Sequence, residues 1–480
     1  MKLKLKVLAA LLAAVIMLPG CASSPKKDAV SPSEPAVSES KTSKKAENKK
    51  KEPEDPPDVA FAKKLQAKLE NGDLDGAIAL FDEIPADIAG TKDMNILHAS
   101  LLISAGNLEK ASVLGKELED AYPEDVEILE MNAIIAKNSG NNASYKSYSN
   151  KILALDPYNS AMNIQAGQEY ALNKKWKQAR NYYKKALVND PNNLDALFGC
   201  GLMNYYIGEV GAARDSFQKI LEIDPHNAMA LAYMGKLAAD NENYLSAVKY
   251  IQEAIKYDDS NYDFYMDYGS YLNTQNRKQE AIAQWEKARD LDPEYFLAYA
   301  YLAGINDELG NFDTALENYR KVIKTNPDYY YAFESAACLE WHAGNWAEAR
   351  EDFYKAYVTG GSTSWSYALM IAATYMKEKN QFKAREWLNP IMKKMNKESI
   401  EYQMMKFYYD NFSKNAANAL AIKISKEEST TKRGKLNFYF GLYNELFNAT
   451  EAASDYYLKV TSMQAPMFFE YRLAEWALGK

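Results

Sequence analysis

The stretch DPNNLDALFGCGLMNYYIGEVGAARDSFQKILEIDP, residues 190–225, begins and ends with the same Asp-Pro pair, and its two prolines are 34 residues apart. The same interval recurs along the chain, with a single vacancy at Asp259, through Pro123, Pro157, Pro191, Pro225, Pro293 and Pro327. A fixed period of this length is the sequence signature of a repeat architecture. The chain of 480 residues is therefore predicted to be an array of one structural unit, because a single core rarely grows to that size.

Within each repeat, small and large residues recur at fixed positions, counted from the third residue after each proline. Position 8 is small in Ala99, Ala133, Gly167, Gly201, Gly235, Gly269, Ala303 and Ala337. Position 20 is mostly alanine, with Tyr145 as the exception, and position 24 is bulky in Tyr183, Phe217, Ile251, Trp285, Tyr319 and Phe353. Two helices of a hairpin approach closely where a small side chain faces a large one. A Gly or Asn near position 15 separates the helices, and proline at position 32 ends the second one.

This pattern resembles the tetratricopeptide repeat (TPR) family in its 34-residue length, its small residues at positions 8 and 20 and its proline at position 32. It departs from the family at position 4, which lacks the usual Trp. The resemblance implies an all-α fold, a solenoid of antiparallel helix hairpins stacked into a right-handed superhelix of about 10–12 repeats. About nine clear repeats are expected over residues 58–363, followed by degenerate repeats in 364–480. An amphipathic helix at 467–476 is expected to cap the array or, alternatively, to dock a partner.

The first 57 residues are predicted to consist of a targeting signal and a flexible tether. Three lysines precede an apolar run from Val7 to Leu18, which is too short to span a bilayer. The run ends in Leu18-Pro19-Gly20-Cys21, which resembles a bacterial lipobox. That resemblance implies a lipoprotein signal peptide at 1–20 and acyl chains such as palmitate on Cys21; the alternative is a plain signal peptide with an incidental cysteine. Residues 21–57 are rich in Lys, acidic residues, Ser and Pro, which predicts a disordered lipidated tether.

The composition argues against several classes of function. With 3 His and 3 Cys in the whole chain, no disulfide framework, metal site or cofactor is expected. We find none of the usual hydrolase, zinc-protease or phosphate-loop motifs, so the chain is predicted not to be an enzyme. A net charge of −8, or −11 once the three lysines of residues 1–20 are removed, makes nucleic acid an unlikely partner.

The resemblance also implies a binding groove. In the family, positions 2, 5, 9, 12 and 13 of each first helix line a concave surface. The candidates for contact with a partner are Phe198, Leu202, Tyr205, Tyr206, Met229, Lys236, Met266, Asn273, Tyr331, Trp341 and His342. Position 5 carries no Lys in any clear repeat, which argues against a carboxylate clamp, whereas aromatic and Met side chains suit an extended peptide or an amphipathic helix. Many of the 36 Tyr residues are expected to fill hairpin cores instead.

These features predict a lipid-anchored TPR scaffold that binds another protein in the cell envelope of a bacterium. Ala22, rather than Asp, follows Cys21, which favours the outer membrane. Two alternatives remain open: a surface-exposed adhesin that binds host or neighbouring cells, and a peptide or small-molecule receptor that serves a transport system.

Overall fold

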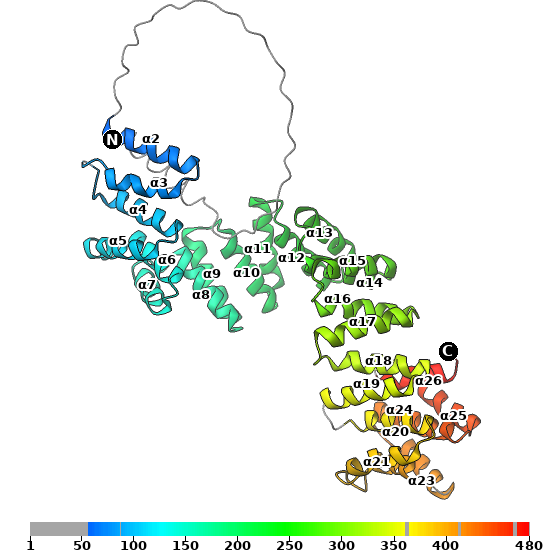
Figure 1. Ribbon diagram of the computed structural model, residues 1–480. Helices are drawn as coiled ribbons and strands as arrows, with labels where there is room; N and C mark the ends of the chain where they lie inside the picture. Colours follow the sequence, from blue (N-terminus) through cyan, green and yellow to red (C-terminus); the bar gives the residue numbers. More distant parts are fainter. Residues whose placement is uncertain (1–55, 87, 361–363, 411–413, 464–467, 480) are drawn as a thin grey trace, which may run out of the picture. The chain divides into compact units, whose positions relative to one another are not determined.

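The computed structural model describes residues 56–479, apart from 87, 361–363, 411–413 and 464–467. The described residues form helices and no strand, which confirms the all-α prediction (Figure 1). The chain divides into two compact units, Met1–Ile223 and Asp224–Lys480. The predicted signal peptide, Cys21 and nearly all of the predicted tether lie outside the described residues.

The first unit consists of consecutive helix pairs. Its helices are α2 (Pro57–Glu70), α3 (Leu74–Ala79) with the short 3-10 helix η1 (Leu80–Glu83), α4 (Lys92–Ser104), α5 (Leu108–Ala121), α6 (Val126–Asn138), α7 (Asn142–Leu155), α8 (Ser160–Leu172), α9 (Trp176–Asn189), α10 (Leu194–Tyr206) and α11 (Val210–Ile223).

The second unit continues the pattern. Its repeats contain α12 (Ala228–Asp240), α13 (Tyr244–Tyr257), α14 (Tyr262–Thr274), α15 (Lys278–Leu291), α16 (Phe296–Glu308), α17 (Phe312–Thr325), α18 (Tyr330–Ala343) and α19 (Trp346–Thr359). They are followed by α20 (Trp365–Lys377), α21 (Gln381–Met392), α22 (Ile400–Tyr409), α23 (Lys414–Ser425), α24 (Thr430–Leu446), α25 (Thr450–Thr461) and α26 (Phe469–Ala477). We call the first helix of each repeat the A helix and the second the B helix.

The turn between the A and B helices always places position 15 in the left-handed region. Six repeats use glycine there, as in Gly208 (φ 80°) and Gly310 (φ 78°). Others place Lys174, Glu242 or Asn276 at φ between 55° and 61°. This conformation ends the A helix while its last carbonyls still accept hydrogen bonds, and it confirms the predicted break near position 15.

The predicted pairing of small and large residues holds the hairpins together. A Cβ atom on Gly201 would lie 2.7 Å from the ring of Phe217, and one on Gly269 would lie 2.4 Å from Nε1 of Trp285. Trp285 is buried, and its indole N–H donates a hydrogen bond of 3.2 Å to the carbonyl of Met266. Position 8 is therefore glycine where the facing ring leaves no room for a side chain.

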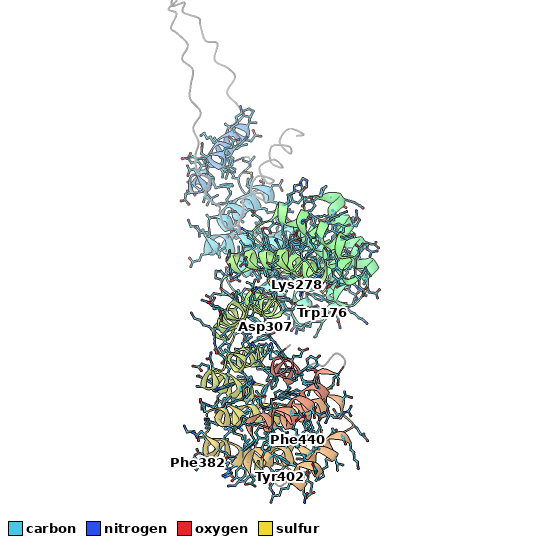
Figure 2. The ribbon with its side chains drawn as sticks, turned by 90° about the vertical axis from the view of Figure 1, so that its right-hand side faces the viewer. Trp176, Lys278, Asp307, Phe382, Tyr402 and Phe440 are labelled. Atoms are coloured by element: carbon cyan, nitrogen blue, oxygen red, sulfur yellow. The ribbon has the colours of Figure 1, made fainter. Side chains whose placement is uncertain are left out.

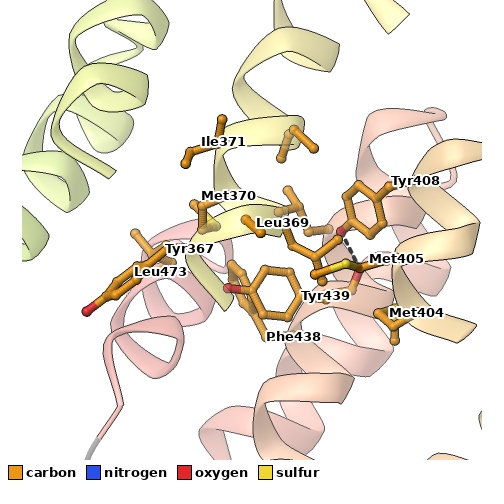
Figure 3. Packing of buried hydrophobic residues seen from close by; sticks show 14 of the residues in the cluster. Tyr367, Leu369, Met370, Ile371, Met404, Met405, Tyr408, Phe438, Tyr439 and Leu473 are labelled. Atoms are coloured by element: carbon orange, nitrogen blue, oxygen red, sulfur yellow. Dashed lines mark hydrogen bonds between the residues drawn. The ribbon is translucent and has the colours of Figure 1, made fainter. Parts of the chain in front are cut away.

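The last helices, α20 to α26, are packed differently. Buried tyrosines connect helices that are distant in sequence: the hydroxyl of Tyr408 donates to the carbonyl of Tyr439 at 2.6 Å (Figure 3). The hydroxyl of Tyr439 lies 2.9 Å from the carbonyl of Ser366 on α20 and 3.0 Å from the carboxylate of Glu470 on α26. Helix α26 also contacts α18, so the C-terminal helix returns to the repeats instead of only covering the end of the stack.

Candidate protein-binding face

The A helices of the second unit share a face that we call the A-helix face, defined as positions 2, 5, 9, 12 and 13 of α12, α14, α16 and α18. A hollow of about 330 Å³ opens on it above α16. The hollow is lined by Asn273, Trp285, Leu297, Ala300, Tyr301, Gly304, Ile305, Glu308 and Tyr329. Asn273, a predicted contact residue, therefore lies at the edge of a cavity that residues of α16 mostly form.

The hollow exists because α16 carries small residues where a side chain could stand. A Cβ atom on Gly304 would have no other atom within 4 Å, in contrast to Gly269 on α14. Tyr301 forms one wall, with its ring 5.1 Å from that of Trp285, and it is 44% exposed. The floor is apolar and the wall is aromatic, which suits a side chain of a bound peptide.

One ion pair borders this hollow, and a second joins α12 to α14. Lys278 on α15 binds Glu308 at 2.7 Å, and Lys236 on α12 binds Asp267 on α14 at 3.1 Å. Burial alone would lower the pKa of Lys236, but the carboxylate of Asp267 outweighs it and raises that pKa above its usual value. Lys236, a predicted contact residue, therefore stays charged and is held between two A helices.

An aromatic ladder runs along the N-terminal ends of the A helices. Its rings include Tyr262 and Tyr295 with centroids 4.6 Å apart, and Phe296 and Tyr329 at 5.5 Å. Tyr331, a predicted contact residue, ends the ladder; it is 52% exposed and lies 5.7 Å from Tyr329. Tyr329 of this ladder also lines the hollow, and the ladder ends in the exposed ring of Tyr331, an arrangement common at protein interfaces.

The predicted residues Trp341 and His342 contact the C-terminal helix. The ring of His342 lies 4.2 Å from that of Trp476, and both rings contact Phe312. Trp341 and Trp476 line a smaller hollow of about 120 Å³ between α18, α24, α25 and α26. Burial, together with the charge of Arg472, lowers the pKa of His342. This part of the A-helix face is therefore covered by the chain itself.

A fork of two hydrogen bonds holds α26 to the face. Both terminal nitrogens of Arg472 donate to the carboxylate of Asp307 on α16, which is 8% exposed (Figure 2 labels Asp307). The guanidinium also lies 4.0 Å from the ring centroid of Trp476. Asp307 occupies position 12, so this ion pair joins a central position of the face to the C-terminal helix.

The remaining predicted residues differ in how accessible they are. Met229 is exposed at the start of α12, but Met266 is 8% exposed and belongs to the core, and Ala232 at the same position 5 of α12 is also buried. In the first unit, Phe198 packs edge-on against Phe217 and Leu202 is half-buried. Tyr205 contacts Tyr206, which is exposed and stacks on Trp176 at 4.8 Å (Figure 2 labels Trp176).

Several residues that shape the face were not predicted. Tyr301 occupies position 6 and Trp285 lies on a B helix, so neither belongs to the family's contact positions. Tyr295 and Tyr329 precede their A helices, although their recurrence one period apart is visible in the sequence. Arg472 and Trp476 lie outside the period altogether, and no regularity in the sequence connects them to Asp307.

Among the described residues, no group of His, Cys, Asp and Glu could hold a metal ion. Cys200 and Cys338 are buried thiols, and burial raises the pKa of Cys200 to about 11, which keeps it protonated and unreactive. No helix within the described ranges combines the length and apolar character needed to cross a membrane.

Comparison with known proteins identifies the repeats. A family model described as tetratricopeptide repeat matches residues 165–228, 234–304 and 307–364. The search among curated proteins returned no match. Repeats of this family are generally non-catalytic and bind protein or peptide partners.

Solved structures that resemble the chain include PilF of Pseudomonas aeruginosa (22% identity, 45% of this chain and 96% of that chain, TM-score 0.35). YrrB, described as a TPR protein with an unusual peptide-binding site, matches with 21% identity over 39% of this chain and 96% of its own (TM-score 0.32). MamA matches with 24% identity over 34% of this chain and 94% of its own (TM-score 0.31). The periodic sequence, the hairpins and the family match agree: the chain is a tetratricopeptide repeat protein, an all-helical scaffold for protein–protein interaction.

Proposed function

We propose that this protein is a lipid-anchored scaffold of the bacterial cell envelope, not an enzyme, and that it binds a partner protein through the A-helix face of its second unit. One observation carries the choice of face. Helix α26 of the same chain lies against α16 and α18 of that face, so the face accommodates a helical segment in cis. Helix-in-groove binding is a recurring mode of peptide recognition.

The chemistry of the face supports binding rather than catalysis. Two of its charged groups, Lys236 and Glu308, are held in ion pairs with Asp267 and Lys278 instead of pointing at a common reaction centre. The hollow at Gly304 is open and has an aromatic wall, which is typical of a contact surface. Nothing in this arrangement pairs a nucleophile with a base.

A filled hollow tests the choice of face. Gly304→Phe places a ring where a Cβ has open space, so the fold is expected to persist while the hollow closes. Gly211→Phe on α11 is the matched control, because its Cβ also meets no other atom within 4 Å. Partner capture is measured by crosslinking in cells followed by mass spectrometry. We expect Gly304→Phe to capture about tenfold less partner than the wild type and Gly211→Phe capture. Equal recovery by both variants would refute this choice of face.

The anchor and the location rest on the sequence of the first 57 residues. Replacing Cys21 by Ser is expected to move the protein from the membrane fraction, by our proposal the outer membrane, to the soluble fraction of the envelope. Protein that stays with the membrane in this variant would contradict the lipid anchor. Rapid loss of the wild-type protein when intact cells are treated with protease would favour the adhesin, because a periplasmic scaffold is shielded.

A further inference from the structure

Helix α26 has two sides with different partners. On one side, Leu473 and Ala474 are buried in the C-terminal hydrophobic core, and the carboxylate of Glu470 lies within hydrogen-bonding distance of the hydroxyl of Tyr439 on α24. On the other side, Arg472 and Trp476 meet α16, the start of α17 and α18. Residues four apart lie on one face of a helix, so these two side chains form one contact surface.

The site that receives Arg472 is incomplete without it. Asp307 is nearly buried, and the hydroxyl of Tyr319 also donates a long hydrogen bond of 3.4 Å to its carboxylate. A carboxylate at this depth is costly unless a cation pairs with it, and two N–H donors from one guanidinium meet both of its oxygens. The repeats therefore present an acid that needs a basic side chain from another segment.

The site that receives Trp476 is aromatic. Its ring lies 5.5 Å from Phe312 and 4.2 Å from His342, and the Arg472 guanidinium covers it at 4.0 Å. The cation and the indole thus stabilise each other while both contact the A-helix face. Asp307, Phe312 and His342 together form a site that fits a basic side chain followed four positions later by an aromatic one.

The rest of the face has the same charge preference. Its defined positions carry the carboxylates of Asp240 and Asp263 in addition to that of Asp307. Glu308, in contrast, is paired with Lys278, and Glu334 accepts a hydrogen bond from the hydroxyl of Tyr367. A partner segment with excess positive charge would complement this face, whereas an acidic one would be repelled.

From these observations we propose that the partner presents a basic amphipathic helix with Arg or Lys four residues before an aromatic residue, and that α26 is an intramolecular competitor for its site. This inference rests on the proposed function, since it specifies the partner of the same face. The partner helix replaces Arg472 at Asp307 and Trp476 at His342, and it reaches the neighbouring hollow at Gly304 that α26 leaves open. While α26 is docked, only the undocked fraction of molecules binds, which lowers the apparent affinity by that fraction.

The test uses the full chain and a labelled synthetic peptide, FFKYRLAKWALG, which copies residues 468–479 but carries Lys in place of Glu470 and Glu475 and is therefore basic. Binding is measured by fluorescence anisotropy for the wild type and for the double variant Arg472→Ala with Trp476→Ala. The variant keeps the buried residues Leu473 and Ala474 but lacks the two side chains that hold α26 to the face. It is therefore expected to bind the peptide at least about tenfold more tightly than the wild type does, a difference of about 1.4 kcal/mol.

Three controls define the site. Adding Asp307→Asn to the double variant is expected to abolish the gain, whereas Arg289→Ala, which breaks an exposed pair with Asp290, is expected to leave wild-type binding unchanged. A peptide with Glu and Ala in place of its Arg and Trp is expected to bind at least about tenfold more weakly. Higher ionic strength is expected to weaken binding of the original peptide. Circular dichroism confirms that each chain is folded.

Equal affinity of the wild type and the double variant, or equal binding of the altered peptide, would overturn the proposal. A wild-type dimer in light scattering that dissociates in the double variant would also overturn it, because the occupant would then be α26 of a second copy. These outcomes are independent of the capture experiment with Gly304→Phe. Loss of the partner in that experiment together with failure of the peptide arms would leave the face in place and reject only this partner chemistry.

Discussion

The repeats α12–α19 and the closing helices α20–α26 belong to one unit but are stabilised in different ways. In the repeats, a small residue faces a large one within each hairpin, as Gly269 faces Trp285. In the closing helices, buried tyrosine hydroxyls find partners on distant helices, as Tyr439 does with Ser366 and Glu470. Shape complementarity can be repeated indefinitely along an array, whereas specific polar pairs between distant segments occur once. The second kind of packing brings the C-terminus back onto the repeats.

The largest difference is expected when the same substitution, Gly to Leu, is made separately at two glycines. Gly269→Leu forces a side chain into the indole of Trp285 and is expected to cost about 3 kcal/mol of unfolding free energy. Gly304→Leu enters open space and replaces a helical glycine, so it is expected to be neutral or to stabilise by up to about 1 kcal/mol. Chemical denaturation of both variants measures the difference. Similar losses at the two positions would show that hairpin packing does not distinguish them.

The polar pairs of the closing helices are tested by Tyr439→Phe. The variant keeps the ring but leaves the buried carboxylate of Glu470 and the carbonyl of Ser366 without the hydroxyl, which is expected to cost about 1–3 kcal/mol. Tyr354→Phe on the exposed surface of α19 is the control and is expected to change stability by less than about 0.5 kcal/mol. Hydrogen exchange is expected to speed up in α24 and α26 only for Tyr439→Phe. Unchanged exchange there would contradict a structural role for these pairs.

The same tyrosines predict sensitivity to alkaline pH. Burial raises the pKa of Tyr408 and Tyr439 well above the usual value of 10.0. Above pH 10 the unfolded chain loses these protons while the folded one keeps them, so stability falls by about 1.4 kcal/mol per pH unit for each tyrosine. The contribution of these two tyrosines to stability is complete below pH 10 and declines as the pH rises above it. Thermal melts of the wild type and of Tyr408→Phe with Tyr439→Phe measure the slope, which is expected to be shallower in the variant.

The smallest effect concerns the turns of the repeats. Glu242 adopts φ 58° at position 15, where Gly310 adopts φ 78°. A left-handed conformation costs roughly 1 kcal/mol for a residue with a Cβ, so Glu242→Gly is expected to stabilise the protein by up to about 1 kcal/mol. Gly310→Glu, the reciprocal change, is expected to destabilise it by about the same amount. A loss of stability in Glu242→Gly would mean that its side chain contributes more than the backbone strain costs.

Most of the fold follows from the sequence because its determinants are local and periodic. The position-8 glycines, the bulky residues at position 24 and the turns at position 15 each act within one hairpin, so one repeat predicts the next. Asn273, Lys236 and Tyr331 lie on A helices as the repeat pattern predicts, and their contact with a partner stays a prediction.

Other parts of the candidate site could not be predicted, because they depend on contacts across many repeats. Arg472 and Asp307 are separated by 165 residues and meet only because the closing helices reverse the direction of the chain. Met266 is buried although position 5 is one of the family's contact positions, because its burial depends on how the neighbouring helices pack. The period distinguishes Gly304, at contact position 9, from Gly269, at packing position 8, but it does not predict that a hollow forms at Gly304.

The most direct measurement compares two tyrosines that are equally exposed. Tyr301 on the A helix α16 and Tyr354 on the B helix α19 are each 44% exposed. Each is replaced in turn by a photoreactive phenylalanine in the full-length protein, and cells are irradiated. We expect a covalent adduct with a partner protein from position 301 and none from position 354. Equal adducts at both positions, or an adduct at 354 alone, would contradict binding through the A-helix face.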